Sequence, residues 1–219
     1  MKTSRAFTLI ELLVAISIIA IMALLTITGA KQYLGRAQLA ACSNNLRSIG
    51  EGAQLYNADH QYFLPWYTVP PSASDLTKTG DGYWWQALAP YVGPNKRVFR
   101  CPADKNFSDA TDDDVARTAS YGWNYKLTGH GDLNTPSDFV KVVTYSKPSR
   151  VLIATDGAGG ASDQQEDSWG YIDERAVHEA DPVRHFGKSS ALFLDGHVER
   201  LDTTNYVNNP TYFVRTNNP

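Results

Sequence analysis

The chain has 219 residues, of which 42% are hydrophobic and 20% are charged, so it can bury a hydrophobic core. Its length allows one ordinary domain with a long appendage, or two small domains. The formal net charge of −3 argues against nucleic-acid binding, which needs an excess of positive charge to neutralise phosphates. The two cysteines have no Cys-x-x-Cys spacing, which argues against a zinc or thioredoxin-type motif.

A long apolar segment follows a short basic N-terminus. Lys2 and Arg5 precede a run that starts at Phe7, and no charged residue occurs from Leu12 to Ala30. At about 1.5 Å per residue, a helix of this length nearly crosses a hydrocarbon core of about 30 Å. The basic residues favour a cytoplasmic N-terminus. The sequence therefore predicts a single-pass inner-membrane protein whose remaining chain is extracytoplasmic.

One carboxylate, Glu11, lies near the start of this apolar segment. A charge at the centre of a membrane helix costs roughly 2.5 to 3.5 kcal/mol, so Glu11 needs either a partner or a position at the interface. Two other interpretations of the segment stay open: a secretory signal cleaved after Ala30, and a plain membrane anchor.

The residues around Glu11 carry a more specific signal. Ala6, then Phe7-Thr8-Leu9-Ile10-Glu11 and the apolar tail, resemble the prepilin signature of type IV pilins and type II secretion pseudopilins. The resemblance implies cleavage by prepilin peptidase between Ala6 and Phe7, followed by methylation of the new amine on Phe7. Ala6 departs from the Gly that the family usually has. The resemblance also implies that Glu11 pairs with the N-terminal amine of a neighbouring subunit during assembly.

This resemblance implies a structural filament subunit and not an enzyme. The expected partners are other subunits of a helical filament, prepilin peptidase, an inner-membrane assembly platform and, before assembly, membrane lipid. The filament would lie in the periplasm or at the cell surface. The expected regions are a leader at 1–6, a membrane and filament-core helix at 7–30, its amphipathic continuation at 31–58 and an extracytoplasmic domain at 59–219.

Apolar residues continue at helical spacing beyond the membrane segment. They recur at steps of three and four residues and would form one face of the helix: Leu39, Cys42, Leu46, Ile49, Ala53 and Tyr56. The sequence therefore predicts one long helix whose second half packs on a domain. Cys42 on this face is expected to form a disulfide with Cys101, which would close a long loop and contribute roughly 4 kcal/mol. Two buried free thiols are the alternative.

Turn signals and aromatic residues fill the chain from residue 60 to about residue 126. The aromatic clusters are Trp66-Tyr67, Tyr83-Trp84-Trp85 and Tyr121-Gly122-Trp123-Asn124-Tyr125. Large rings can fill a small core beneath long loops, which is the ordinary interpretation. A solvent-facing ring platform for sugars is the alternative, and burial of Trp84 and Trp85 decides between the two.

The C-terminal part is typical of β-strands. Strands are expected at 141–145, 151–154, 191–194 and 197–201. Asp195 and Gly196 separate the last two, which predicts a two-residue type I′ turn with Leu194 opposite His197. The expected fold class is α+β and pilin-like: a long N-terminal helix packed on a C-terminal antiparallel sheet, with a long loop-rich insertion.

His185, Asp195 and Gly196 form a His-x9-Asp-Gly pattern. With the leader motif, Asn44-Asn45-Leu46-Arg47 and Phe99-Arg100-Cys101-Pro102, the pattern resembles a large family of pilin-like proteins abundant in planctomycetes, whose C-terminal domain has no assigned chemistry. A structural role is the ordinary interpretation, with His185 hydrogen-bonded to the turn. A metal site that also includes His197 and Asp156 is the alternative.

No cofactor is expected, apart from an optional divalent ion. Two acidic loops offer oxygen ligands for calcium, although neither has EF-hand spacing: Asp112-Asp113-Asp114, and Asp163 with Glu166 and Asp167. Three functions remain on sequence alone. They are a filament subunit, a membrane-anchored module that binds carbohydrate or another extracellular ligand, and a metal-dependent hydrolase.

Overall fold

The computed structural model describes residues 7–63, 67–69, 84–93, 96–105, 107, 119–124, 130–132, 145, 147–157, 171–172, 184–185 and 187–202. The chain forms two compact units, the N-terminal unit Met1–Gln38 and the C-terminal unit Leu39–Pro219. Most of the expected strand at 141–145 and both acidic loops lie outside the described residues.

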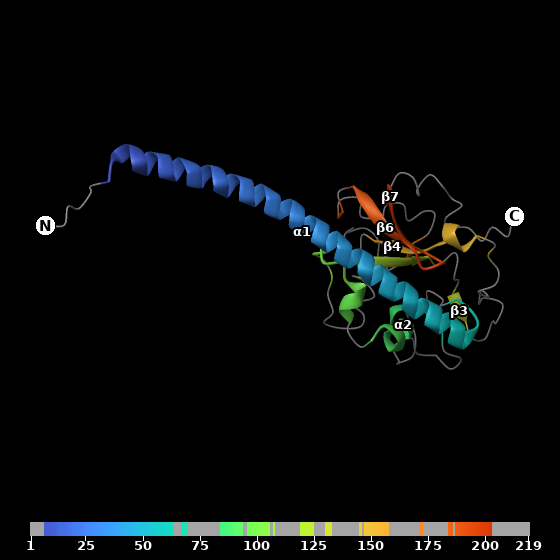
Figure 1. The fold of residues 1–219 in the computed structure, drawn as a ribbon. Coiled ribbons are helices and arrows are strands. Elements are labelled where there is room, and N and C mark those ends of the chain that lie inside the picture. The colour runs from blue at the N-terminus through green and yellow to red at the C-terminus, as the bar shows by residue number, and fades with distance from the viewer. Residues whose placement is uncertain are drawn as a thin grey trace, which may run out of the picture. The chain divides into compact units, whose positions relative to one another are not determined.

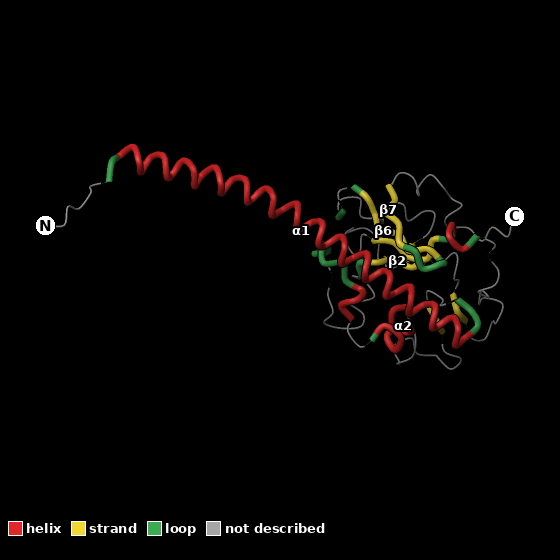
Figure 2. Tube along the Cα trace, viewed as in Figure 1, coloured by secondary structure: helices red, strands yellow, loops and turns green. Residues whose placement is uncertain are grey.

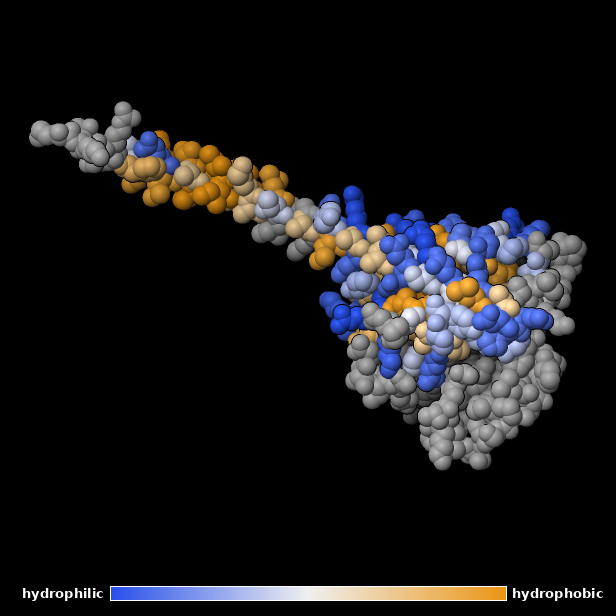
Figure 3. Space-filling view, turned by 60° about the horizontal axis from the view of Figure 1, so that its bottom comes forward, coloured by the Kyte–Doolittle hydropathy of each residue, from blue (hydrophilic) through white to orange (hydrophobic). Residues whose placement is uncertain are grey.

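The predicted long helix is confirmed as α1, which runs from Leu9 to His60 (Figure 1). In the N-terminal unit its large apolar side chains are exposed where they are described, and Figure 3 shows a hydrophobic surface along the face of the helix in view. The stretch Leu9–Thr26 is long and apolar enough to cross a membrane, with a mean hydropathy of 2.7 and none of it buried. These side chains therefore need an apolar environment outside the chain itself.

In the C-terminal unit the same helix has a buried face. The positions predicted from helical spacing are buried, except Leu39, which is half-buried. Gly50 lies on this face, and a Cβ atom there would be 2.8 Å from Leu192 Cδ1. A small residue at this point lets the helix approach the sheet closely, which explains a glycine in a helix interior.

Five strands form the main sheet, in the order β5-β2-β4-β6-β7 (Figures 1 and 2). The strands are β2 (Tyr121–Asn124), β4 (Leu152–Asp156), β5 (Tyr171–Ile172), β6 (Lys188–Phe193) and β7 (Val198–Asp202). From β2 to β7 neighbouring strands are antiparallel, as predicted, whereas the short β5 pairs in parallel with β2.

The other described elements are short. They are β1 (Tyr67–Val69), α2 (Trp84–Val92), the 3₁₀ helix η1 (Lys96–Phe99), β3 (His130–Asp132) and the 3₁₀ helix η4 (Pro148–Arg150). Strands β1 and β3 form a separate parallel pair. The architecture is an N-terminal apolar helix followed by short helices and an antiparallel sheet, which is the predicted α+β class and is consistent with a pilin-like fold.

An aromatic cluster fills the core beside α1. Trp84 stacks on Trp123 with ring centroids 5.1 Å apart, and Phe99 meets Trp84 edge-on at 5.4 Å. Trp84 and Trp85 are only 1% and 3% exposed. The ordinary interpretation of these rings as core is therefore confirmed, and at these two positions the rings do not form a solvent-facing platform for sugars.

The predicted two-residue turn between β6 and β7 was wrong. Leu192 pairs with Val198, so Phe193 lies opposite His197 and the loop has three residues. Only Gly196 in this loop has a positive φ, of 88°, whereas a type I′ turn needs positive φ at Asp195 as well. The backbone N–H of Leu194 also donates to the carbonyl of Val151, which keeps Leu194 bonded to the chain on the other side of β6.

Candidate functional site

The N-terminal segment places Phe7 and Thr8 directly before the first turn of α1. Phe7 is 76% exposed, and Ala6 on the other side of the predicted cleavage point lies outside the described residues. The start of the helix and the residues just before it therefore present an apolar ring, that of Phe7, and the carboxylate of Glu11 within five residues of each other.

Glu11 has a hydrogen-bond partner at the start of its own helix, in Thr8. Its Oε2 accepts hydrogen bonds from the backbone N–H of Thr8 at 2.9 Å and from the Thr8 hydroxyl at 2.8 Å. The Thr8 Oγ1 in turn lies 3.3 Å from the backbone N of Glu11. This reciprocal arrangement is a capping box, which satisfies backbone N–H groups that a helix start otherwise leaves unbonded.

This capping role of Thr8 was not predicted from the sequence. The signal was present, because Thr8-x-x-Glu11 has the spacing of a capping box ahead of an apolar run. Among the described residues both bonds from Thr8 end on Oε2, so Oε1 of Glu11 is available to another donor. The carboxylate can therefore cap its own helix and still accept a hydrogen bond from another molecule.

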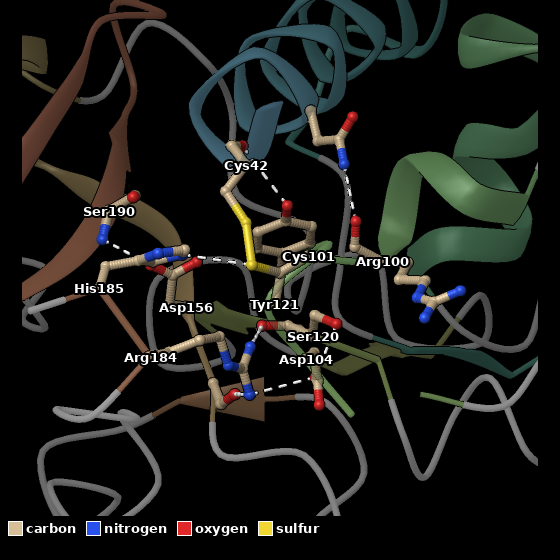
Figure 4. The surroundings of a disulfide bond; sticks show 12 residues. Cys42, Arg100, Cys101, Asp104, Ser120, Tyr121, Asp156, Arg184, His185 and Ser190 are labelled. Atoms are coloured by element: carbon tan, nitrogen blue, oxygen red, sulfur yellow. Dashed lines mark hydrogen bonds and ion pairs between the residues drawn. A yellow bond between two sulfur atoms is a disulfide. The ribbon is translucent and has the colours of Figure 1, made fainter. Parts of the chain in front are cut away.

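The predicted disulfide between Cys42 and Cys101 is confirmed (Figure 4). It links the buried face of α1 to the residue two places after η1, across 59 positions of sequence. Asn45, one turn further along α1, donates from Nδ2 to the carbonyl of Arg100 at 2.7 Å. Covalent and polar contacts thus hold the same short segment against the helix.

Two ionisable side chains are buried beside the disulfide. Nε2 of His185 lies 3.2 Å from Sγ of Cys101 and 3.6 Å from Oδ2 of Asp156, the last residue of β4. Figure 4 shows both side chains directed at the sulfur atoms. The backbone N–H of Ser190 donates to the same carboxylate oxygen at 2.7 Å. Burial raises the pKa of nearby Tyr121, and the Asp156 carboxylate raises it further, so this hydroxyl stays neutral.

A buried ion pair fixes the residue that precedes His185. Arg184 Nη2 lies 3.1 Å from Oδ2 of Asp104, and their side chains are 3% and 2% exposed. The guanidinium also donates to the carbonyls of Ser120 and Gly157, at 3.0 and 2.7 Å. These bonds join Arg184 to three separate segments and so hold the residue directly before His185 in place.

The remaining members of the His-x9-Asp-Gly pattern lie in the β6–β7 hairpin. Oδ1 of Asp195 is hydrogen-bonded to both the ring Nδ1 and the backbone N–H of His197. Partial burial disfavours the charged form of Asp195, but these hydrogen bonds outweigh it and lower the carboxyl pKa below its ordinary value. Gly196 lies against α1, where a Cβ atom would be 2.7 Å from Nε2 of Gln54.

The four residues that the sequence suggested as a metal site therefore lie in two separate places. His185 and Asp156 lie together beside the disulfide, whereas Asp195 and His197 bind each other in the hairpin. The side chain of His185 contacts Cys101 across a sequence separation of 84 residues, and no motif in the sequence links these two positions.

Comparison with known proteins gives a match for the N-terminal segment. Residues 1–27 match the family model described as the prokaryotic N-terminal methylation motif. Neither the comparison with curated proteins nor that with solved structures gives a match. The motif implies processing by prepilin peptidase and assembly into a pilus or pseudopilus, and with the apolar helix it fits a membrane-anchored precursor. The chain thus carries the N-terminal motif of a type IV pilin-like or pseudopilin-like precursor, which indicates a structural subunit rather than an enzyme.

Proposed function

We propose that this protein is a structural subunit of a type IV pilus-like or type II secretion pseudopilus filament. Prepilin peptidase would cut between Ala6 and Phe7, and the mature helix would then enter the filament core from the membrane. The observation that carries the proposal is the methylation motif at residues 1–27, which ends within an exposed apolar helix that bears Glu11 near its start.

Electrostatics supplies a reason for Glu11 in this position. Cleavage before Phe7 creates an α-amino group with a reference pKa near 8, which is largely protonated at neutral pH. Opposite charges about 4 Å apart attract by on the order of 4 kcal/mol at an effective dielectric constant of 20. This attraction is of the same order as the roughly 2.5 to 3.5 kcal/mol that one charge costs in a membrane helix, so a neighbour's amine can offset much of the cost of Glu11.

The capping bonds from Thr8 do not prevent such a pair. An N-cap contributes about 1 kcal/mol, which is less than the attraction expected from a neighbouring amine. Both capping bonds also end on Oε2 of Glu11, so Oε1 can accept the amine while the cap stays in place. Thr8 would therefore hold the carboxylate at the helix start in the membrane-inserted monomer and in the filament.

The exposed side chains of the N-terminal unit fit the same proposal. The large apolar residues between Phe7 and Leu25 are at least half exposed, including Leu13 at 53% and Leu25 at 66%. A helix that is apolar all round is normally buried in lipid or among other helices. Lipid would surround it before assembly, and the helices of neighbouring subunits would surround it in the filament.

The test is to express Glu11→Gln beside the wild type in a cell that assembles the filament, and to shear filaments from the surface or the membrane fraction. Wild-type protein should appear in the high-mass fraction with a methylated N-terminal Phe7. Glu11→Gln should remain in the membrane, with at least tenfold less protein in the high-mass fraction, because the neutral amide cannot pair with the amine. Immunoblotting and intact-mass analysis measure both results.

Glu51→Gln is the matched control, since Glu51 is an exposed acid on the same helix in the C-terminal unit. It should assemble as the wild type does. Mature protein that retains residues 1–6, or wild-type filament yield from Glu11→Gln, would overturn the proposal.

A further inference from the structure

The disulfide lies inside a cluster of four metal-binding residue types. Cys42 comes from α1, Cys101 from the segment after η1, Asp156 from the end of β4 and His185 from the segment before β6 (Figure 4). All four side chains are buried, and one ligand atom from each lies within 4.8 Å of the others. A buried disulfide needs no imidazole or carboxylate beside it, and burying such polar groups costs free energy unless they are bonded.

From this arrangement we propose that the reduced protein binds a Zn²⁺ ion through Cys42, Cys101, His185 and Asp156. Thiolate, imidazole and carboxylate are the three ligand types that Zn²⁺ takes in proteins, and four protein ligands make a closed structural site. The two sulfur ligands also argue against calcium or magnesium, which prefer oxygen. The inference does not depend on filament assembly.

Two distances between ligand atoms, both involving His185, are already close to those of a tetrahedral zinc site. With Zn–S bonds of about 2.3 Å and Zn–N and Zn–O bonds of about 2.0 to 2.2 Å, ligand atoms in a tetrahedron lie about 3.3 to 3.8 Å apart. His185 Nε2 already lies 3.2 Å from Cys101 Sγ and 3.6 Å from Asp156 Oδ2. No two of the four ligand atoms are more than 4.8 Å apart, which is about 1 Å beyond the tetrahedral range. Side-chain rotation can remove this difference once the S–S bond is broken.

Neighbouring groups already orient two of the ligands. The backbone N–H of Ser190 donates to Asp156 Oδ2 at 2.7 Å, and the Arg184–Asp104 ion pair fixes the chain directly before His185. Partners of this kind orient metal ligands and raise metal affinity. The ligands would therefore need little reorganisation, apart from separation of the two sulfur atoms.

The conversion between the two states balances with a dithiol reductant. The dithiol gives two electrons and two protons to the Cys42–Cys101 bond, so two protein thiols form and the reductant becomes a disulfide. Zn²⁺ then displaces the two thiol protons and binds both thiolates. In either state Cys42 and Cys101 stay linked, first covalently and then through the metal, so α1 remains tied to the segment after η1.

The test uses the untagged full-length chain in detergent micelles, unfolded in denaturant and refolded with Co²⁺ as a spectroscopic probe. Refolding with a thiol reductant should give one Co²⁺ per chain, with a thiolate-to-cobalt charge-transfer band and the strong visible bands of tetrahedral cobalt. One equivalent of Zn²⁺ should abolish these bands. The chain refolded without reductant should show none of them.

His185→Gln and Asp156→Asn should each weaken Co²⁺ binding by the reduced chain at least tenfold. His197→Gln is the matched control, because its ring is exposed in the β6–β7 hairpin, and it should bind as the wild type does. Equal Co²⁺ binding by reduced and oxidised wild type, or unchanged binding by both ligand variants, would overturn the proposal. If a ligand variant fails to fold, the comparison between reduced and oxidised wild type still decides.

Discussion

The two units of the chain differ in what surrounds their apolar side chains. In the N-terminal unit the apolar residues of α1 are exposed, and none of the stretch Leu9–Thr26 is buried. In the C-terminal unit the same helix buries Cys42, Leu46 and Ile49 completely. One unit therefore depends on lipid or other subunits for its apolar contacts, whereas the other supplies its own.

The two units also differ in how far apart in the sequence their hydrogen-bonded polar groups lie. In the N-terminal unit the carboxylate of Glu11 has a local partner, Thr8, three residues away. In the C-terminal unit the buried polar contacts join distant segments, as the Arg184–Asp104 pair does. Substitutions in the first unit should therefore change assembly, whereas substitutions in the second should change folding.

Truncating a buried ring should give the largest effect. Trp84→Ala should lower the free energy of unfolding of the C-terminal unit by about 3 to 5 kcal/mol, because it leaves a cavity where Trp84 stacks on Trp123. Denaturant unfolding followed by near-ultraviolet circular dichroism measures the change. Leu13→Ala makes a similar truncation at a side chain that is 53% exposed, and it should change this free energy by less than about 0.5 kcal/mol. Equal losses from the two variants would contradict the division between the units.

Reducing the disulfide should have the next largest effect. The chain-entropy model gives a loss of about 4 kcal/mol for a bond that joins residues 59 positions apart, when a chelator prevents metal from replacing it. Denaturant unfolding of the reduced and oxidised chains measures the loss. Amide hydrogen exchange in Leu9–Thr26 should be the same in both forms, because the bond lies in the other unit. Faster exchange there on reduction would show that the two units are coupled.

Removing the helix cap should have a smaller and local effect. Thr8→Val keeps the side-chain shape but removes the hydroxyl that bonds to Glu11, at a cost of about 1 kcal/mol to the first turn. Amide exchange in that turn, measured in micelles, should become roughly fivefold faster. Thr26→Val is the matched control, since its hydroxyl donates to the carbonyls of Met22 and Ala23 and caps no helix start. The same exchange rates in Thr8→Val and wild type would show that the capping box does not hold the helix end.

The sequence predicted the long helix, its buried face and the Cys42–Cys101 disulfide, but not the hairpin register or the contacts around the disulfide. Helical spacing identified the buried face of α1, because periodicity is a property of neighbouring residues. The predicted hairpin register was wrong by one residue. It considered only the turn residues, whereas Leu194 is hydrogen-bonded to Val151, beyond the hairpin. The disulfide and a pairing of His185 with Asp156 were both suggested by the sequence, but their meeting in one cluster was not, because the four residues come from four segments that meet only in the folded chain. The absence of a Cys-x-x-Cys spacing therefore said little about this site.

The smallest effect should come from the hairpin turn at Asp195. The folded state holds the pKa of this carboxyl below its ordinary value near 3.8, mainly because hydrogen bonds from His197 outweigh the effect of partial burial. The stabilisation is therefore present above about pH 4 and is lost as the pH falls through the folded-state pKa. It should amount to less than about 1 kcal/mol, because the side chain is 34% exposed.

Asp195→Asn tests the direction of this pH dependence directly. The wild type should be more stable than the variant near pH 6, and the difference should shrink as the pH falls toward about 2, as measured by denaturant unfolding at each pH. Glu199→Gln is the control: its carboxylate is 58% exposed and 3.9 Å from the His197 ring, so it should show a weaker dependence. A difference for Asp195→Asn that stays constant with pH would mean that Asp195 acts through the shape of the turn and not through its charge. The His-x9-Asp-Gly pattern would then owe its second half to backbone geometry alone.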